Sequence, residues 1–170
     1  VADGQKALGL ELSNPLGSTL GDPYTSTLTI FDDETLTVRF QSAEYTVNEG
    51  DGTATIEVTL SPASIAPVTV NFSTADGTAT APEDYTAVTS QEVKFEAGDT
   101  TQSATVSIVN DSLNELNETV SLILDSQNPA NVVIANSPAT LVILDNDPEP
   151  SVKFKSDKYT VDESAGKVTL

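Results

Sequence analysis

Residues 53–60, with the sequence TATIEVTL, decide the class of fold of this chain. Every second residue of the stretch is apolar, and the residues between are threonine or glutamate. Successive side chains of a β-strand point to opposite faces, so this pattern predicts a strand with one buried and one exposed face. The same alternation appears in residues 68–72 (VTVNF) and 103–108 (SATVSI). No stretch has the spacing of an amphipathic helix, so the sequence favours an all-β protein.

Turn-forming residues divide the sequence around this strand into short segments. Pairs such as Ser61-Pro62 and Asn128-Pro129 end the alternating stretches, and we expect Asp76 and Asp99 to cap backbone amides in turns. About seven strands separated in this way are typical of two packed sheets. We therefore predict a seven-stranded antiparallel immunoglobulin-like β-sandwich. Its predicted strands are residues 36–48, 53–60, 67–74, 84–95 with a break, 101–110, 118–126, and 132–145 with a break.

The chain repeats itself at a distance of 114 residues. The stretch VRFQSAEYTVNE at residues 38–49 returns as VKFKSDKYTVDE at residues 152–163, and residues 10–34 match residues 122–147 less closely. A repeat of this length is a whole domain, so we expect tandem repeats of the sandwich. The expected division is residues 1–34 as the C-terminal strands of an upstream repeat, 35–148 as a complete repeat, and 149–170 as a linker and the first two strands of a downstream repeat.

The composition requires an aliphatic core and leaves few classes of function open. The sequence has no Cys, His, Met or Trp, and its aromatic residues are four Tyr and five Phe. The lack of cysteine excludes disulfides and thiolate metal sites. No apolar run is long enough for a membrane-spanning helix. Without a nucleophile motif, a phosphate-binding loop or an aromatic cluster, an enzyme or a carbohydrate-binding module is the poorest interpretation.

The charge is strongly negative, with 26 acidic and 7 basic residues and a net charge of −19. Within residues 35–148, Arg39 and Lys94 are the only basic residues against sixteen acidic ones. Such a surface repels nucleic acids and anionic membranes, so we expect no nucleic-acid partner and no membrane insertion. Two interpretations remain, a solubilising surface and a site for divalent cations. The choice between them depends on whether the carboxylates converge.

Loops of an antiparallel sandwich alternate between its two ends, which predicts where carboxylates meet. The end of the first predicted strand, the start of the fourth, the turn after the fifth and the end of the seventh can share one end. Like charges a few Å apart cost about 1–4 kcal/mol per pair, so such a cluster calls for a cation. Oxygen ligands alone suit Ca²⁺, whereas zinc prefers His or Cys. The carboxylates expected at this end are Glu49, Asp84, Asp111, Glu115, Glu118, Asp145 and Asp147.

Five motifs in this region resemble those of the Calx-beta domain, the calcium-binding module of sodium/calcium exchangers that also occurs in bacterial surface and adhesion proteins. They are Glu49 after YTV, DGTATAPEDY at 76–85, FEAGDT at 95–100, NDSLNELNE at 110–118, and ILDND at 143–147. The resemblance implies that the seven carboxylates are Ca²⁺ ligands beside the interdomain joint. Asn110 and Asn146 stand where strong binders of the family carry Asp, so we expect about two or three ions.

These observations favour a calcium-binding structural repeat of a long extracellular filament, adhesin or matrix protein, in which Ca²⁺ at the joints stiffens the array. The alternative is a regulatory calcium sensor like that of the exchangers. We expect an extracellular or cell-surface location and no enzymatic activity. The expected partners are neighbouring repeats of the same chain or fibre, with a cell-surface or matrix ligand as an open alternative.

Overall fold

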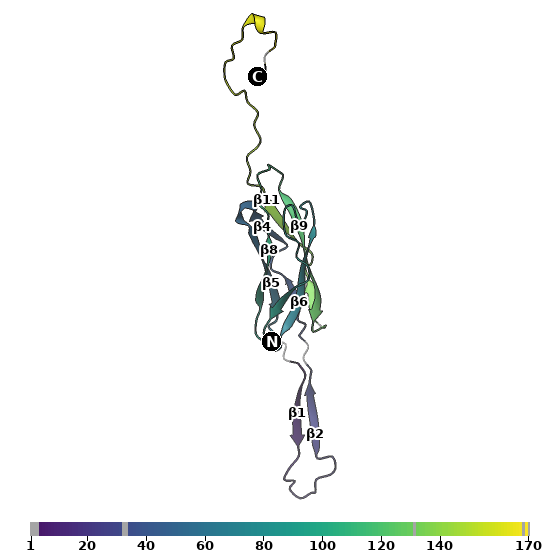
Figure 1. The fold of residues 1–170 in the computed structure, drawn as a ribbon. Helices are drawn as coiled ribbons and strands as arrows, with labels where there is room; N and C mark the ends of the chain where they lie inside the picture. Colours follow the sequence, from purple (N-terminus) through teal and green to yellow (C-terminus); the bar gives the residue numbers. More distant parts are fainter. Residues whose placement is uncertain (1–3, 32–33, 131, 168, 170) are drawn as a thin grey trace.

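The computed structural model describes residues 4–31, 34–130, 132–167 and 169, and its centre is a sandwich of two β-sheets (Figure 1). The first sheet contains, in spatial order, β10 (Val133–Ala135), β3 (Thr37–Phe40), β5 (Thr53–Ser61) and β8 (Thr101–Ser107). The second contains β4 (Glu44–Asn48), β11 (Ala139–Leu144), β9 (Glu118–Asn128), β6 (Val68–Asp76) and β7 (Gln91–Phe95). The predicted all-β sandwich is therefore confirmed.

The first predicted strand, residues 36–48, is wrong as a single element. Its two halves form β3 and β4, which lie in different sheets, and the last predicted strand likewise divides into β10 and β11 at its break. The purely antiparallel arrangement is also wrong, because β3 pairs with β10 and β4 with β11 in parallel. The reason is topological. The first and seventh strands of an up-and-down chain run in the same direction, so they pair in parallel when they become neighbours.

The core lies between the sheets and follows from the alternating pattern. In β5 the four apolar side chains are buried, and in β6 the core positions are Val68, Val70 and Phe72. Phe40 of the first sheet meets Phe72 of the second edge to face, with ring centroids 6.3 Å apart. Each fully buried Val, Leu, Ile or Phe side chain contributes about 1.5–3 kcal/mol to folding, so a mainly aliphatic core can stabilise the sandwich.

A hairpin of β1 (Lys6–Glu11) and β2 (Thr25–Ile30) precedes the sandwich and lies at the end where β3 begins (Figure 1). Its pairing copies that of β9 with β11. Leu10 pairs with Ser26 and Leu8 with Leu28, as Leu122 pairs with Ala139 and Val120 with Leu141. The hairpin therefore has the register of the last two long strands of the sandwich.

Residues 149–167 leave the sandwich at its opposite end (Figure 1). The two strands expected in this segment are absent from its described residues, which contain the short 3-10 helix η2 (Glu163–Ala165). In the sandwich β3 pairs with β5 and β4 with β11, so both strands depend on partners from other segments of the repeat. The helical segments in the described ranges are two three-residue 3-10 helices, far shorter than the roughly 20 residues of a membrane-spanning helix.

Candidate metal centre

The seven predicted carboxylates meet at one end of the sandwich, where β4, β8 and β11 finish and β9 begins. We call this set the acidic end: Glu49, Asp84, Asp111, Glu115, Glu118, Asp145 and Asp147. Six of them form two groups of three whose nearest carboxylate oxygens lie within 4.8 Å of one another. The convergence predicted from the alternation of loops is correct, and the structure adds the division into two groups.

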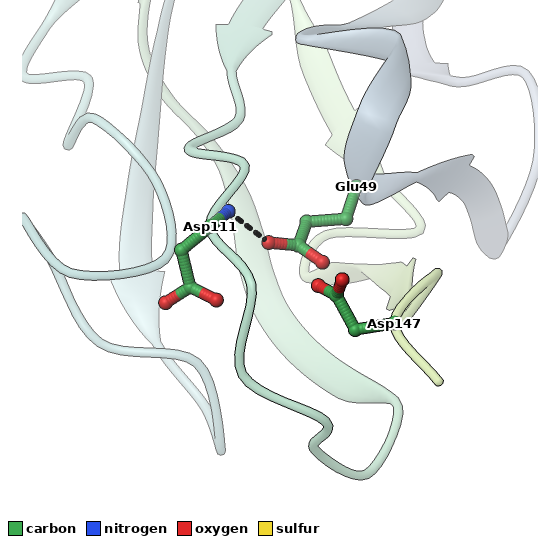
Figure 2. A group of neighbouring side chains, drawn as sticks. All are labelled: Glu49, Asp111 and Asp147. Carbon is green, nitrogen blue, oxygen red and sulfur yellow. Dashed lines mark hydrogen bonds between the residues drawn. The ribbon is translucent and has the colours of Figure 1, made fainter. Parts of the chain in front are cut away.

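The first group contains Glu49, Asp111 and Asp147 (Figure 2). Glu49 opens the 3-10 helix η1 (Glu49–Asp51) directly after β4 and is buried, with 8% of its surface exposed. Its Oε1 accepts a hydrogen bond of 2.7 Å from the backbone N–H of Asp111. The other Glu49 oxygen faces the Asp147 carboxylate (Figure 2). The buried Oδ2 of Asp147 has no hydrogen-bond partner, an arrangement that is unfavourable unless a cation or water satisfies it.

The second group contains Asp84, Glu115 and Glu118. Asp84 is fixed by Thr80, whose backbone N–H donates to Oδ2 at 2.7 Å and whose hydroxyl donates at 3.2 Å. Burial first, and then the neighbouring charges of Asp84 and Glu115, raise the pKa of Glu118. Burial and the carboxylates of Asp111 and Asp84 likewise raise the pKa of Glu115. Both shifts express the same physical fact, that negative charge is crowded here.

Asp145 connects the two groups. It lines the same hollow as Glu49, Asp111 and the whole second group. Its Oδ2 accepts a hydrogen bond of 3.0 Å from Nδ2 of Asn114, and the same amide donates to the backbone oxygen of Asp147 at 2.9 Å. Asn114 thus ties the loop after β8 to the segment that leaves β11.

Two residues of this end were not predicted. Asn114 was missed because an amide adds no charge, although its place between Asp111 and Glu115 was a usable signal. Glu83 lines the hollow beside Asp84, and nothing in the alternating pattern distinguishes it from a solvent-facing glutamate. Asp76 and Asp99, in contrast, have the turn roles expected of them. Asp76 accepts from the Ala81 N–H, and Asp99 accepts from the Glu96 N–H.

No basic side chain neutralises the acidic end among the residues that line the hollow. Arg39 pairs with Thr59 near the far end of β5, and Lys94 pairs with Thr69 near the far end of β6. Lys94 also forms an ion pair of 2.6 Å with Glu96. The two basic residues of the complete repeat are therefore both remote from the seven carboxylates.

The donor set fits a hard divalent cation. It consists of carboxylate oxygens, one of them buried and without a partner, in a sequence that has no His or Cys. Calcium accepts about six to eight oxygens with adaptable geometry, whereas magnesium demands a near-ideal octahedron. The chemistry of these residues therefore suits Ca²⁺ best, and the first group together with Asp145 offers the most buried ligands.

The family model of the Calx-beta domain matches residues 32–147 and, a second time, residues 145–170. The chain belongs to the Calx-beta domain family. This confirms the resemblance inferred from the five motifs. The second match begins where the segment after β11 leaves the acidic end, so the family pattern itself continues across this position.

Similar proteins include matrix and calcium-binding proteins. The Calx-beta chain is 29% identical to Extracellular matrix protein 3 of Lytechinus variegatus, over 95% of this chain and 6% of that protein, so it spans a small fraction of its relative. The apo-form Calx CBD1 domain is 27% identical with a TM-score of 0.62, over 67% of this chain and 100% of that one. The calcium binding domain CBD12 of CALX1.1 is 25% identical with a TM-score of 0.61, over 65% of this chain and 46% of that one.

Proposed function

We propose that this Calx-beta chain is a calcium-binding structural segment of an extracellular array, in which Ca²⁺ at the acidic end stiffens the joint to the next repeat. One observation carries the proposal. Asp145 and Asp147 belong to the segment that leaves β11, whereas Glu49 and Asp111 belong to loops of the sandwich body. An ion held by both sets fastens the departing segment to the body, and the energy of binding then stabilises that arrangement.

The like charges of the acidic end support calcium as the ligand. Without a cation, the carboxylates of each group repel one another at effective dielectrics of 20 to 80 by about 1–4 kcal/mol per close pair. The raised pKa values of Glu115 and Glu118 agree with this crowding. A divalent ion converts the repulsion into attraction, so we expect the folded state to be markedly more stable with calcium.

Local structure that repeats along the chain supports an array. The Tyr159 hydroxyl accepts from the Ser156 N–H at 3.1 Å, as the Tyr45 hydroxyl accepts from the Ser42 N–H at 3.2 Å. The helix η2 occupies the position of η1, and the β1–β2 hairpin has the register of β9 and β11. We therefore keep the division into residues 1–34, 35–148 and 149–170 as part of the proposal.

The proposed location is extracellular and the proposed role is structural, not enzymatic. The relative named Extracellular matrix protein 3 supports both, as does a strongly acidic surface that keeps a long chain dispersed. The proposed partners are neighbouring repeats, and a cell-surface or matrix ligand is a further candidate partner.

The test is a calcium titration of the 170-residue chain by calorimetry, with thermal unfolding in calcium and in chelator. We expect a Kd of about 10⁻⁴–10⁻³ M, the range of extracellular modules, and a clear rise in melting temperature. Hydrogen exchange of the backbone amides of residues 143–147 should slow with calcium, because these residues hold the joint.

A pair of matched variants makes the test specific. Asp145→Asn with Asp147→Asn should abolish most of the calcium effect. Asp125→Asn, which removes an exposed carboxylate of β9 away from the acidic end, should leave it unchanged. The absence of binding heat, with equal melting temperatures in calcium and chelator, would mean that the carboxylates only solubilise the chain.

The second candidate is a regulatory calcium sensor. The similarity to the calcium binding domain CBD12 of CALX1.1 favours it. A sensor binds more tightly, with a Kd of about 10⁻⁷–10⁻⁵ M. The same titration therefore separates the two functions by affinity.

A further inference from the structure

Two asparagines face each other beside the first carboxylate group. Nδ2 of Asn146 donates a hydrogen bond of 3.0 Å to Oδ1 of Asn110. Gly50 lies against this pair, since a Cβ atom at this position would stand 2.6 Å from Asn146 Nδ2 and 3.5 Å from Asn110 Oδ1. Only a residue without a side chain leaves the pair undisturbed here.

Gly50, Asn110 and Asn146 are uncharged, and each is the sequence neighbour of one residue of the first carboxylate group. Gly50 follows Glu49 in η1, Asn110 precedes Asp111 after β8, and Asn146 precedes Asp147 after β11. The same three segments therefore meet at two neighbouring places, once through carboxylates and once through uncharged residues. The carboxylates repel one another without a cation, whereas the amides attract one another without any ion.

We propose that Gly50, Asn110 and Asn146 form a cation-independent brace that keeps the segment after β11 attached when calcium is absent and limits cation binding to the carboxylate groups. This inference rests on the proposed function for its calcium part only. The Asn110 oxygen already accepts a hydrogen bond from the Asn146 amide, so a cation there would compete with this bond, and neither side chain adds negative charge. The brace therefore lowers both the number of ions and the dependence of the joint on them.

The first test exchanges the brace for two carboxylates, with Asn110→Asp and Asn146→Asp together. In chelator, two anionic oxygens at this separation should lower the melting temperature by about 5 °C or more. In excess calcium, the loss should be recovered and calorimetry should detect additional bound calcium. The control is Gln41→Glu with Gln91→Glu, which adds two charges to exposed side chains elsewhere and should change neither quantity.

The second test breaks the brace without changing charge. Gly50→Ala should displace the Asn146 side chain and lower the melting temperature in chelator by about 2–6 °C, with the calcium stoichiometry unchanged. Asn146→Ala should have the same effect. Gly9→Ala is the control, because a Cβ at Gly9 meets no atom within 4 Å.

The outcomes separate this inference from the proposed function. Unchanged melting in chelator for Gly50→Ala, Asn146→Ala and the double Asp variant would overturn the brace. Suppose that the unaltered chain binds calcium. If the double Asp variant then binds no additional calcium, the proposal that the brace limits the number of ions is overturned. If the unaltered chain binds no calcium while the variants still lose stability in chelator, the brace stands and the proposed function fails.

Discussion

Glu115 and Glu118 are the residues at which the crowding of negative charge is most evident. Burial, followed by neighbouring carboxylates, raises the pKa of each above the ordinary value of 4.5. A raised pKa in the folded state means that folding favours the protonated form. The folded chain then binds more protons than the unfolded chain between the two pKa values, so stability falls as the pH rises through that window.

We predict that in chelator the melting temperature of Glu115→Gln with Glu118→Gln falls less than that of the unaltered chain as the pH rises from about 4.5 toward neutrality. Other carboxylates titrate in the same range, so the difference between the two proteins is the informative quantity. Thermal unfolding at a series of pH values measures it. Parallel pH profiles would show that the two glutamates are not crowded in the folded state.

Tyr85 also has a perturbed pKa. Its side chain is buried, and its hydroxyl donates to Asp76 Oδ1 at 2.7 Å. Burial and this hydrogen bond raise the pKa of Tyr85 to about 12. We predict that Tyr85→Phe costs about 1.5–3 kcal/mol, the range for a hydrogen bond to a charged group. Denaturant unfolding checks this value. A loss of only about 0.5–1 kcal/mol, the size expected of a neutral hydrogen bond, would argue against a charged acceptor.

At the scale of the elements, the loop after β6 is fastened to the start of β9. Thr78 and Thr119 exchange hydrogen bonds, and the Ala79 N–H donates to the Thr119 oxygen at 3.1 Å. Gly77 permits this approach, because a Cβ there would lie 2.4 Å from the Thr119 backbone oxygen. The contact fixes the start of β9, where Glu118 lies, so the loop that carries Asp84 also positions a second carboxylate of the acidic end.

We predict that Gly77→Ala destabilises the chain by about 1–3 kcal/mol, because backbone atoms must move to admit the methyl group. Denaturant unfolding measures the loss. Gly21→Ala, where a Cβ meets no atom within 4 Å, should have almost no effect. A Gly77→Ala variant as stable as the unaltered chain would show that the loop is free to move from β9.

At the scale of the whole molecule, the net charge of −19 opposes the compact state through self-repulsion. We predict that 1 M NaCl, where the Debye length is about 3 Å, raises the melting temperature in chelator. With excess calcium the same salt should raise the melting temperature less, because calcium already neutralises the strongest repulsion. Thermal unfolding with and without NaCl tests this, and an equal response in both conditions would place the repulsion outside the acidic end.

The sequence by itself determined most of the strands, the 114-residue sequence repeat and the set of carboxylates, but not the division of residues 36–48 between two strands. Alternation in residues 53–60 and the turn pairs are local signals, and the 114-residue offset fixes equivalent positions without any knowledge of the fold. Only the tertiary structure decided that β3 and β4 separate into different sheets, and that the carboxylates divide into two groups. It also brought Asn114 to Asp145, and Gly50 to the Asn110–Asn146 pair. These features depend on contacts between segments distant in sequence, and neither a period of two nor a charge count contains that information.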